Sequence, residues 1–290
     1  MSERIVIVGP GRMGLALGSA LAACGEVRRL TFFGREVEPP PHPLFERRTG
    51  GIEYRLGPQP LPPETTIVVL AVPDDRLGEV ARGLAGAGAA PAGCVAFHLA
   101  GALTTEVLAP LHAVGYAVGS LHPLQTVADP WSGGDRLIGS AFAIAGEPAA
   151  LAAGRRLVAA LRGKPLVVPP TLRPLYHAAA VFASNYLVAL VAVAARLLGE
   201  AGVPESDALP AVLPLVRGTL DNLEQLGIAA ALTGPIARGD VDTVRRHLAR
   251  LSPEERTLYS ALGLEALGLA RAAGLDARHA AELEALLSFE

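Results

Sequence analysis

Hydrophobic residues in the first half of the chain gather in short runs that alternate with helical patterns. Residues 4–8, 30–33, 66–72 and 94–99 form runs rich in apolar side chains, as expected for parallel strands covered on both faces. A helical pattern over residues 13–23 follows the first run. This alternation of strand and helix predicts an α/β fold built on a doubly wound, mostly parallel sheet.

The hydrophobic pattern changes near the middle of the chain. Three more short runs, at residues 116–120, 141–145 and 166–168, extend the predicted sheet. Beyond Pro170 only helical patterns remain. We therefore expect a sheet domain over residues 1–168 and an all-α domain over residues 169–290.

Two local signals describe the helical domain further. Ser252 stands before Pro253, with Glu255 three positions after the serine, which is the pattern of a capped helix start. Pro210 and Pro214 fall inside a helical pattern and predict a broken or kinked helix, because proline lacks the N–H that the helix needs.

Composition narrows the class of protein. The 290 residues carry a net charge of −3, so electrostatics gives no support for binding to nucleic acid or to an anionic membrane. Two cysteines far apart in the sequence indicate neither a disulfide framework nor a metal site. The segment before the first run lacks the pattern of a signal peptide. We expect a cytoplasmic protein without a bound metal.

One segment is long and apolar enough to need separate treatment. Residues 178–195 contain no charge, which by length alone allows a membrane span. Polar side chains, Ser184 and Asn185 among them, lie near the centre of this segment, and it is rich in alanine. We expect a helix buried in a helical core and no membrane association.

A glycine motif follows the first apolar run. Gly9, Gly11 and Gly14 form G-x-G-x-x-G between a predicted strand and a predicted helix, the context in which this motif binds a dinucleotide. The helix N-terminus offers free N–H groups to a diphosphate. These features predict a Rossmann domain, with a turn that binds nothing as the alternative. The loop residues expected to contact the cofactor are Gly9, Pro10, Gly11, Arg12, Met13 and Gly14.

The end of the second run bears on the choice of cofactor. NAD enzymes usually place an acidic residue there to bind the ribose 2′-hydroxyl. This chain has Gly34 and Arg35 at that place, and an arginine pairs with a 2′-phosphate. The pattern therefore favours NADP, with Arg12 as additional charge. The alternatives are that Arg35 is a surface arginine and that Glu36 binds the ribose of NAD.

Small residues end the next two predicted strands. The carboxyl ends of parallel strands line the ligand crevice in this fold, so these residues are expected to border the ribose and nicotinamide. They are Ala71, Val72, Pro73, Ala100 and Gly101.

Polar residues follow the run at residues 116–120. His122 precedes a proline, which holds it extended, and Gln125 follows shortly after. Hydride transfer to a carbonyl or imine requires a proton at the heteroatom, and a histidine with a pKa near neutrality can supply it. We expect His122 to be the catalytic acid or base and Gln125 to contact the substrate. The alternative is a histidine that only organises a loop.

The helix predicted after Pro174 carries a polar stripe. On a 3.6-residue period His177, Ser184 and Asn185 share one face with valines. Buried serine and asparagine side chains destabilise the fold unless they are hydrogen-bonded, so they either join helices or hold a substrate. We include all three residues among the candidate catalytic residues.

Five stretches together carry a family resemblance over nearly the whole chain. They are VIVGPGRMG, LAVPDDRL, GSLHPLQT, YHAAAVFASNYLVAL and LTGPIARGD. The chain resembles bacterial Rossmann-like relatives of the NADP-dependent oxidoreductases with a 6-phosphogluconate-dehydrogenase-like helical C-terminal domain. The resemblance implies hydride transfer to or from NADP in a cleft between two domains, and a homodimer formed through the helical domain.

More distant relatives suggest roles for single residues. Prephenate dehydrogenases have a similar His-Pro, and the resemblance implies that His122 is its counterpart. The β-hydroxyacid dehydrogenases carry a catalytic lysine where this chain has Val181, so their chemistry does not transfer. In pyrroline-5-carboxylate reductases a loop comparable to residues 233–238 helps bind a carboxylate, which suggests Arg238 as a substrate ligand.

These observations lead to one preferred function and two alternatives. We expect an NADP-dependent oxidoreductase that acts on a small carbonyl, imine or hydroxyacid. In such an enzyme the cofactor carries the hydride, and the protein orients the substrate and exchanges a proton with it. A non-catalytic NADP sensor or scaffold keeps the glycine loop without turnover. A reductase of a deazaflavin coenzyme is the other alternative, since some relatives reduce that coenzyme with NADP.

Overall fold

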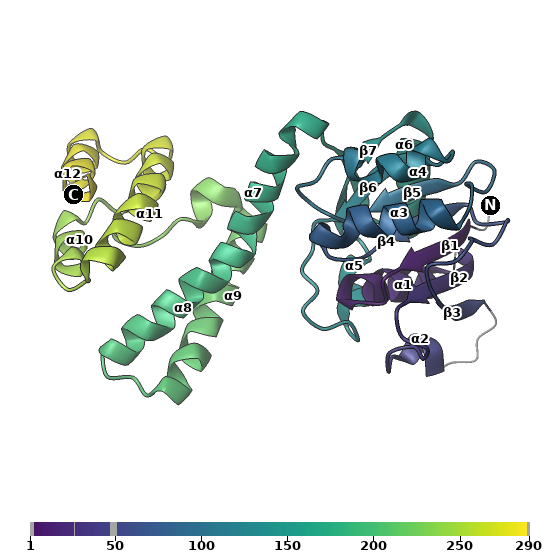
Figure 1. Cartoon of the computed structure of the whole chain (residues 1–290). Helices are drawn as coiled ribbons and strands as arrows, with labels where there is room; N and C mark the ends of the chain where they lie inside the picture. The colour runs from purple at the N-terminus through teal and green to yellow at the C-terminus, as the bar shows by residue number, and fades with distance from the viewer. Residues whose placement is uncertain (1–2, 26, 47–50, 289–290) are drawn as a thin grey trace. The chain divides into compact units, whose positions relative to one another are not determined.

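The computed structural model describes residues 3–25, 27–46 and 51–288 (Figure 1). The chain forms two compact units, residues 1–187 and residues 188–290. The first contains the sheet with its surrounding helices and the second is helical.

The first unit is built on a sheet with the strand order β3-β2-β1-β4-β5-β6-β7-β8. Strands β1 to β6 run parallel, β7 is antiparallel to β6, and β8 is parallel to β7. The strands are β1 (Glu3–Val8), β2 (Val27–Gly34), β3 (Ile52–Leu56), β4 (Ile67–Leu70), β5 (Val95–His98), β6 (Ala117–Pro123), β7 (Ala141–Gly146) and β8 (Lys164–Val167).

Helices cover both faces of this sheet (Figure 1). Because side chains alternate along a strand, Ile5 and Ile7 of β1 pack on one face, and Val6 and Val8 on the other. The first face is covered mainly by α1, α5 and α6, and the second by α3 and α4. The helices are α1 (Arg12–Cys24), α2 (Pro43–Glu46), α3 (Leu77–Ala87), α4 (Ala109–Ala113), α5 (Gly133–Leu137), α6 (Pro148–Ala160) and α7 (Arg173–Ala183).

Helices form the second unit. They are α8 (Asn185–Glu200), whose first residues belong to the first unit, α9 (Glu205–Ala231), α10 (Val241–Leu248), α11 (Pro253–Ala272) and α12 (Ala277–Leu287). A small core joins the last three helices through Val244, Leu267 and Leu283. The predicted helix start at Ser252 is confirmed, because Ser252 and Glu255 form a reciprocal capping box. Helix α9 runs on through Pro210 and Pro214 and instead leaves helical geometry at Gly227.

The predicted fold class is confirmed, with two differences in detail. The sequence pattern missed β3 and ended β6 too early, since β6 continues through Ser120 and His122 to Pro123. Gly119 does not end β6 but lies inside it, where a Cβ would crowd Phe97 and Ala150. The predicted boundary between residues 168 and 169 falls just after β8, whereas the compact units change between residues 187 and 188.

Candidate active site

The glycine loop joins β1 to α1 in a geometry that requires its first and last glycines. Gly9 has φ 103°, a value that side chains with a Cβ rarely adopt, and its N–H donates to Phe33 O at 2.9 Å. A Cβ on Gly14 would overlap the carbonyl oxygen of Gly9. The strand and helix therefore approach as closely as a dinucleotide-binding turn requires.

Gly11 is different, because a Cβ there would meet no protein atom within 4 Å. Gly11 is the N-cap of α1, and no side chain caps the helix. Within the described ranges, the first turn of α1 also contains no acidic residue. This exposed helix end presents N–H groups and a positive dipole, so the loop fits a diphosphate that lies against the main chain.

The carboxyl end of β2 places Gly34 and Arg35 beside this loop, as predicted. The ring of Tyr54 packs so closely on Gly34 that a Cβ would overlap its hydroxyl group. That hydroxyl donates a hydrogen bond of 2.8 Å to the carbonyl oxygen of Glu36. Arg35, Glu36 and Arg12 are all exposed, so each side chain is available to a ribose or its phosphate.

The residues after β4 and β5 complete the same edge of the sheet. Ala71 N–H donates to Val8 O at 2.8 Å, and the side chains of Ala71 and Val72 lie against Gly14 and Gly9. Pro73 begins the short 3₁₀ helix η1 (Asp74–Arg76). After β5, Ala100 and Gly101 are buried. All predicted cofactor residues therefore lie near the carboxyl ends of β1, β2, β4 and β5.

A cluster of aromatic polar side chains meets Gly101 at this edge. His122, the penultimate residue of β6, is half-buried, and its Nδ1 lies 2.8 Å from the hydroxyl oxygen of Tyr176 on α7. The ring of His177 lies 6.1 Å from that of His122, between centroids. A Cβ on Gly101 would overlap His177 and lie 2.9 Å from His122 Nε2. Gly101 is therefore required for this arrangement.

The pKa of His122 is lower than the sequence analysis predicted. Burial, the Arg173 guanidinium and His177 together lower the pKa of His122 to about 4. Its imidazole is therefore neutral at pH 7, whereas the sequence analysis predicted a pKa near neutrality. A neutral imidazole can accept a proton or a hydrogen bond, but it is not a ready proton donor.

Arg173, which the sequence analysis did not single out, lies beneath this cluster. Its side chain is fully buried, and it donates to Ser120 Oγ at 2.9 Å and to Ala100 O at 2.8 Å. Among the described residues, its Nε has no hydrogen-bond partner and no carboxylate forms an ion pair with it. The site therefore contains a buried positive charge without a protein counter-ion.

The sequence analysis also did not single out Tyr176 and Asp74, which lie close to this cluster. Tyr176 is half-buried, and burial raises its pKa while Arg173 lowers it. Asp74 lies close enough to His177 for His177 to lower its pKa, although burial raises that pKa overall. The sequence does not show that Tyr176 contacts His122, because the two residues are 54 positions apart. Its position beside His177 in a helical pattern is the only feature that could have drawn attention to it.

Ser184 and Asn185 do not continue the predicted stripe. The helix ends at Ala183, Ser184 adopts φ −123° and ψ −69°, and a separate helix begins at Asn185. Asn185 is exposed and Ser184 is only half-buried, so the expectation that both are buried is wrong. The stripe assumed one continuous helix, and the break at Ser184 interrupts it. The catalytic roles of Ser184 and Asn185 stay predictions.

Within the described ranges, the two predicted substrate residues form no hydrogen bond with the histidine cluster, although Gln125 follows His122 by only three positions. Gln125 is exposed, and its amide lies 3.3 Å from the carbonyl oxygen of Arg136 at the end of α5. Arg238 is exposed in the turn between α9 and α10 of the second unit. Both substrate roles stay predictions. Among the described residues, no group of His, Cys, Asp and Glu is arranged to hold a metal.

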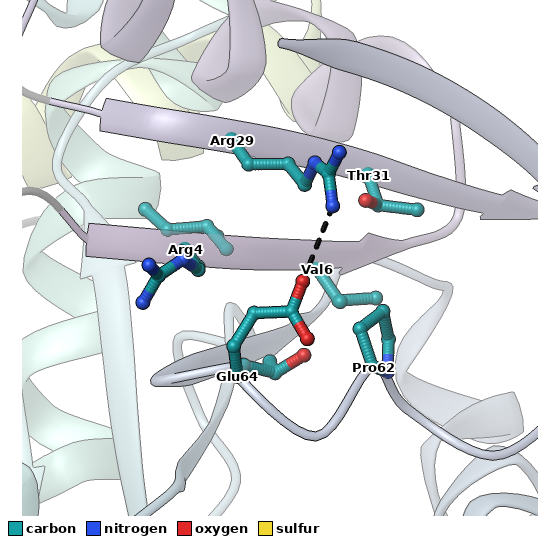
Figure 2. Close-up of a pocket in the computed structure, with 8 residues that line it drawn as sticks. Arg4, Val6, Arg29, Thr31, Pro62 and Glu64 are labelled. Carbon is teal, nitrogen blue, oxygen red and sulfur yellow. Dashed lines mark hydrogen bonds and ion pairs between the residues drawn. The ribbon is translucent and has the colours of Figure 1, made fainter.

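Two cavities of the first unit lie at the opposite edge of the sheet. Figure 2 shows one of about 10 Å³ between the amino-end segments of β1 and β2, where Arg29 pairs with Glu64 at 3.2 Å. An open hollow of about 570 Å³ lies beside it, lined by Arg4, Arg28, Arg29, Gly51 and Glu64. Ligands of α/β sheets bind at the carboxyl ends of the strands, so these cavities are not the candidate site.

Comparisons with known proteins agree with this architecture. Residues 2–123 match the family model of the Rossmann-like domain, and residues 140–266 match that of a domain of unknown function, DUF2520. These two matches confirm the family resemblance seen in the sequence. No curated protein matches the sequence.

Several solved structures share the fold. A Thermotoga maritima protein is 23% identical with a TM-score of 0.71, over 93% of this chain and 99% of that protein. A Bacteroides fragilis protein, provisionally described as an NADP oxidoreductase, is 22% identical with a TM-score of 0.65, over 93% and 97%. The pyrroline carboxylate reductase of Plasmodium falciparum, solved with NADP bound, is 14% identical with a TM-score of 0.58, over 99% and 98%.

Proposed function

We propose that this chain, a Rossmann-like domain joined to a DUF2520 domain, is an NADP-dependent oxidoreductase. Its substrate is a small molecule with a carbonyl, an imine or a hydroxyl group. One observation supports this proposal most strongly. The glycine loop with its uncapped helix and the His122–Tyr176 pair lie at the same carboxyl edge of one sheet.

The fit of the cofactor rests on the main chain. Gly9 and Gly14 bring β1 and α1 together, and Gly11 leaves open the space that a diphosphate would fill. When bound, the nicotinamide supplies or accepts the hydride. The residues of this chain would hold the dinucleotide, orient the substrate and move one proton.

The preference for NADP over NAD rests on Arg35. Its guanidinium is exposed at the end of β2, where a ribose 2′-phosphate is bound in this fold. Glu36 is also exposed there, but its carbonyl oxygen is held by Tyr54. An arginine fork attracts the phosphate and an acidic side chain repels it, so the balance between these two residues determines the preference.

Binding measurements test the cofactor proposal. We expect the Kd for NADPH to be at least about tenfold lower than that for NADH, because hydrogen bonds to a charged group contribute about 1.5–3 kcal/mol. Arg35→Ala should remove most of this difference. Arg155→Ala, which changes an exposed arginine on α6, should leave it intact. Equal Kd values for NADPH and NADH in the unchanged protein would contradict the assignment.

Turnover distinguishes the enzyme from a sensor. An oxidoreductase should oxidise NADPH in the presence of some members of a panel of carbonyls, imines and deazaflavins. A protein that binds NADPH tightly but oxidises it with no member of the panel would support the sensor alternative.

We also propose that two copies of the chain associate through the helices from α7 to α9. Large apolar side chains are exposed on them, and residues 170–200 are long and apolar enough, by length and composition, to cross a membrane. The most exposed are Leu175, Phe182, Val188, Leu215 and Ile228. Burial of these side chains against a second copy would remove them from water, and symmetric pairing of identical chains is the commonest form of association.

A further inference from the structure

We propose that Tyr176 is the residue that exchanges the proton with the substrate, and that His122 positions its hydroxyl group. This inference rests on the proposed oxidoreductase function and assigns the acid–base role to Tyr176, which lies within one of the five family stretches but was not named there as a candidate residue. The other titratable groups that interact with the pair are Arg173 and His177 on α7 and His98 on β5, and Asp74 on η1 interacts with His177.

The contact with His122 fixes the position of the Tyr176 hydroxyl group. The Tyr176 hydroxyl oxygen lies 2.8 Å from His122 Nδ1, and the two rings meet edge to face at 89°. His122 is fixed by the pairing of β6 with β7, opposite Ala143. Both residues are half-buried, so neither is enclosed in the core.

The charges around the pair favour the tyrosine as the acid. With a pKa of about 4, only about one His122 ring in a thousand carries a second proton at pH 7. Burial raises the pKa of Tyr176, so its hydroxyl keeps its proton at neutral pH. The buried charge of Arg173, three residues earlier on α7, would stabilise the tyrosinate that remains after proton transfer.

The proposed step balances in the direction of reduction. Hydride adds to the carbonyl carbon of the substrate, and the π electrons of the C=O bond move to its oxygen. That oxygen takes the proton of the Tyr176 O–H group, whose bonding electrons stay on the phenolic oxygen. In the tautomer that carries its hydrogen on Nδ1, His122 donates a hydrogen bond to the tyrosinate and keeps its own proton. The tyrosinate then recovers a proton from solvent. Oxidation of a hydroxyl group follows the same path in reverse.

A second Tyr–His pair provides a matched control. In the second unit the hydroxyl of Tyr259 lies 2.9 Å from His247 Nδ1, also with an edge-to-face arrangement of the rings. His247 is exposed, whereas His122 is half-buried beside Arg173. Tyr259→Phe therefore measures the effect of losing a Tyr–His hydrogen bond away from the candidate site, for comparison with Tyr176→Phe.

A titration without substrate tests whether Tyr176 faces the reacting ring. The protein is labelled with ¹³C at tyrosine Cζ, and the Tyr176 and Tyr259 signals are assigned with Tyr176→Phe and Tyr259→Phe. The nicotinamide ring of NADP⁺ is positively charged and that of NADPH is neutral. We expect the pKa of Tyr176 to be lower in the NADP⁺ complex than in the NADPH complex, and that of Tyr259 to be the same in both.

Identical Tyr176 pKa values in the two complexes would overturn the inference and leave the proposed function standing. Failure of the protein to bind either dinucleotide would instead refute the proposed function itself. In turnover, Tyr176→Phe should lower kcat by about 10²-fold or more, with the Kd for NADPH changed less than about threefold. Tyr259→Phe should leave kcat unchanged. A folded Tyr176→Phe protein that retains full kcat would also overturn the inference.

Discussion

At the scale of single residues, the site is dominated by a buried cation and by two histidines that are neutral at pH 7. Arg173 donates to Ser120 on β6 and to Ala100, two residues after β5. Burial is the larger cause of the lowered pKa of His98 and of His122, and the Arg173 charge lowers both further. Burial of an unpaired charge destabilises a fold, so its retention indicates a role at the site. A substrate or transition state that becomes negative would be stabilised here.

The two neutral histidines predict how stability depends on pH. The pKa of each is about 4 in the folded chain, against 6.5 for an ordinary histidine. Between pH 6.5 and 4 the unfolded chain therefore binds protons that the folded chain does not. Their contribution is fully present above pH 6.5 and is lost as the pH falls toward 4. The loss is on the order of 3 kcal/mol for the fully buried His98 and smaller for the half-buried His122, because solvent screens its charge.

Urea unfolding between pH 7.5 and 4.5 measures this loss. His122→Asn should reduce the loss of unfolding free energy at low pH by the amount that His122 contributes. His279→Asn, at an exposed position, should leave that loss unchanged. A pH dependence that is unchanged by His122→Asn would show that this histidine is not held neutral.

Gly101 offers a test of the packing around the pair. Gly101→Ala would place a Cβ against His177 and within 2.9 Å of His122 Nε2, so the rings must shift. We expect kcat to fall by about tenfold or more, and the free energy of unfolding to fall by about 1–3 kcal/mol. Gly86→Ala on α3, where a Cβ meets nothing within 4 Å, should stabilise the protein by up to about 1 kcal/mol. Equal kcat values in the two variants would argue against the described site.

Residue types in the sequence indicated part of this site. His122 stood out because a histidine before a proline interrupts an apolar run, and His177 because a polar group interrupts an apolar helix. Arg173 resembled the exposed start of a helix before Pro174. Its burial depends on contacts with Ser120 and Ala100, 53 and 73 positions away, and a single sequence does not show such contacts.

At the scale of elements, α7 is the helix that brings the site together. It carries Arg173, Tyr176 and His177, and Arg173 attaches its first turn to β6 and to the end of β5. Because α7 ends at Ala183, the orientation of this short helix is set by the sheet and not by the following helix alone.

Arg173→Met tests the electrostatic role of this helix start. Loss of the charge should raise the pKa of both His98 and His122 above 4, although burial should keep each below 6.5. Arg173→Lys retains the charge and should leave both pKa values near 4. Histidine side-chain NMR titration measures both values. Low pKa values that persist in a folded Arg173→Met protein would assign the shift to burial alone.

Among the elements, the buried strands were predicted best. Residues 5–8 of β1 and the whole of β4 are continuous apolar runs, because both faces of the sheet are covered there. Strand β3 lies at the edge of the sheet, and its residues Ile52–Leu56 alternate with polar side chains, so no continuous run indicated it. The predicted strand stopped at Ser120 because the polar His122 and then Pro123 interrupt the apolar run, although β6 continues to Pro123.

At the scale of the whole molecule, the exposed apolar helices predict association. Val188 and Leu215 have exposed fractions of 71% and 73%. The double variant Val188→Glu and Leu215→Glu should convert a dimer to a monomer in light scattering coupled to size exclusion, because charges are strongly disfavoured inside an interface core. Arg155→Glu on α6 should leave the dimer intact.

Two outcomes would contradict this prediction. An unchanged protein that is monomeric at micromolar concentration would show that these helices do not pair. Purification that requires detergent, together with sedimentation with lipid vesicles, would indicate that residues 170–200 enter a membrane.

The two-part organisation of the chain was visible in its sequence because the hydrophobic period changes once. Strand–helix alternation in the first part and the glycine motif at its start predicted the sheet and the cofactor loop. The roles of Gln125 and Arg238 were suggested only by their place in the sequence and by the resemblance, and contacts with a ligand are needed to test them.

A crystal structure of the protein with bound NADP⁺ tests the central claim most directly. The account predicts diphosphate oxygens within hydrogen-bond distance of the N–H groups in the first turn of α1, the 2′-phosphate beside Arg35, and the nicotinamide facing Tyr176 and His122. A dinucleotide bound at the opposite edge of the sheet, or a nicotinamide ring turned away from this pair, would contradict it.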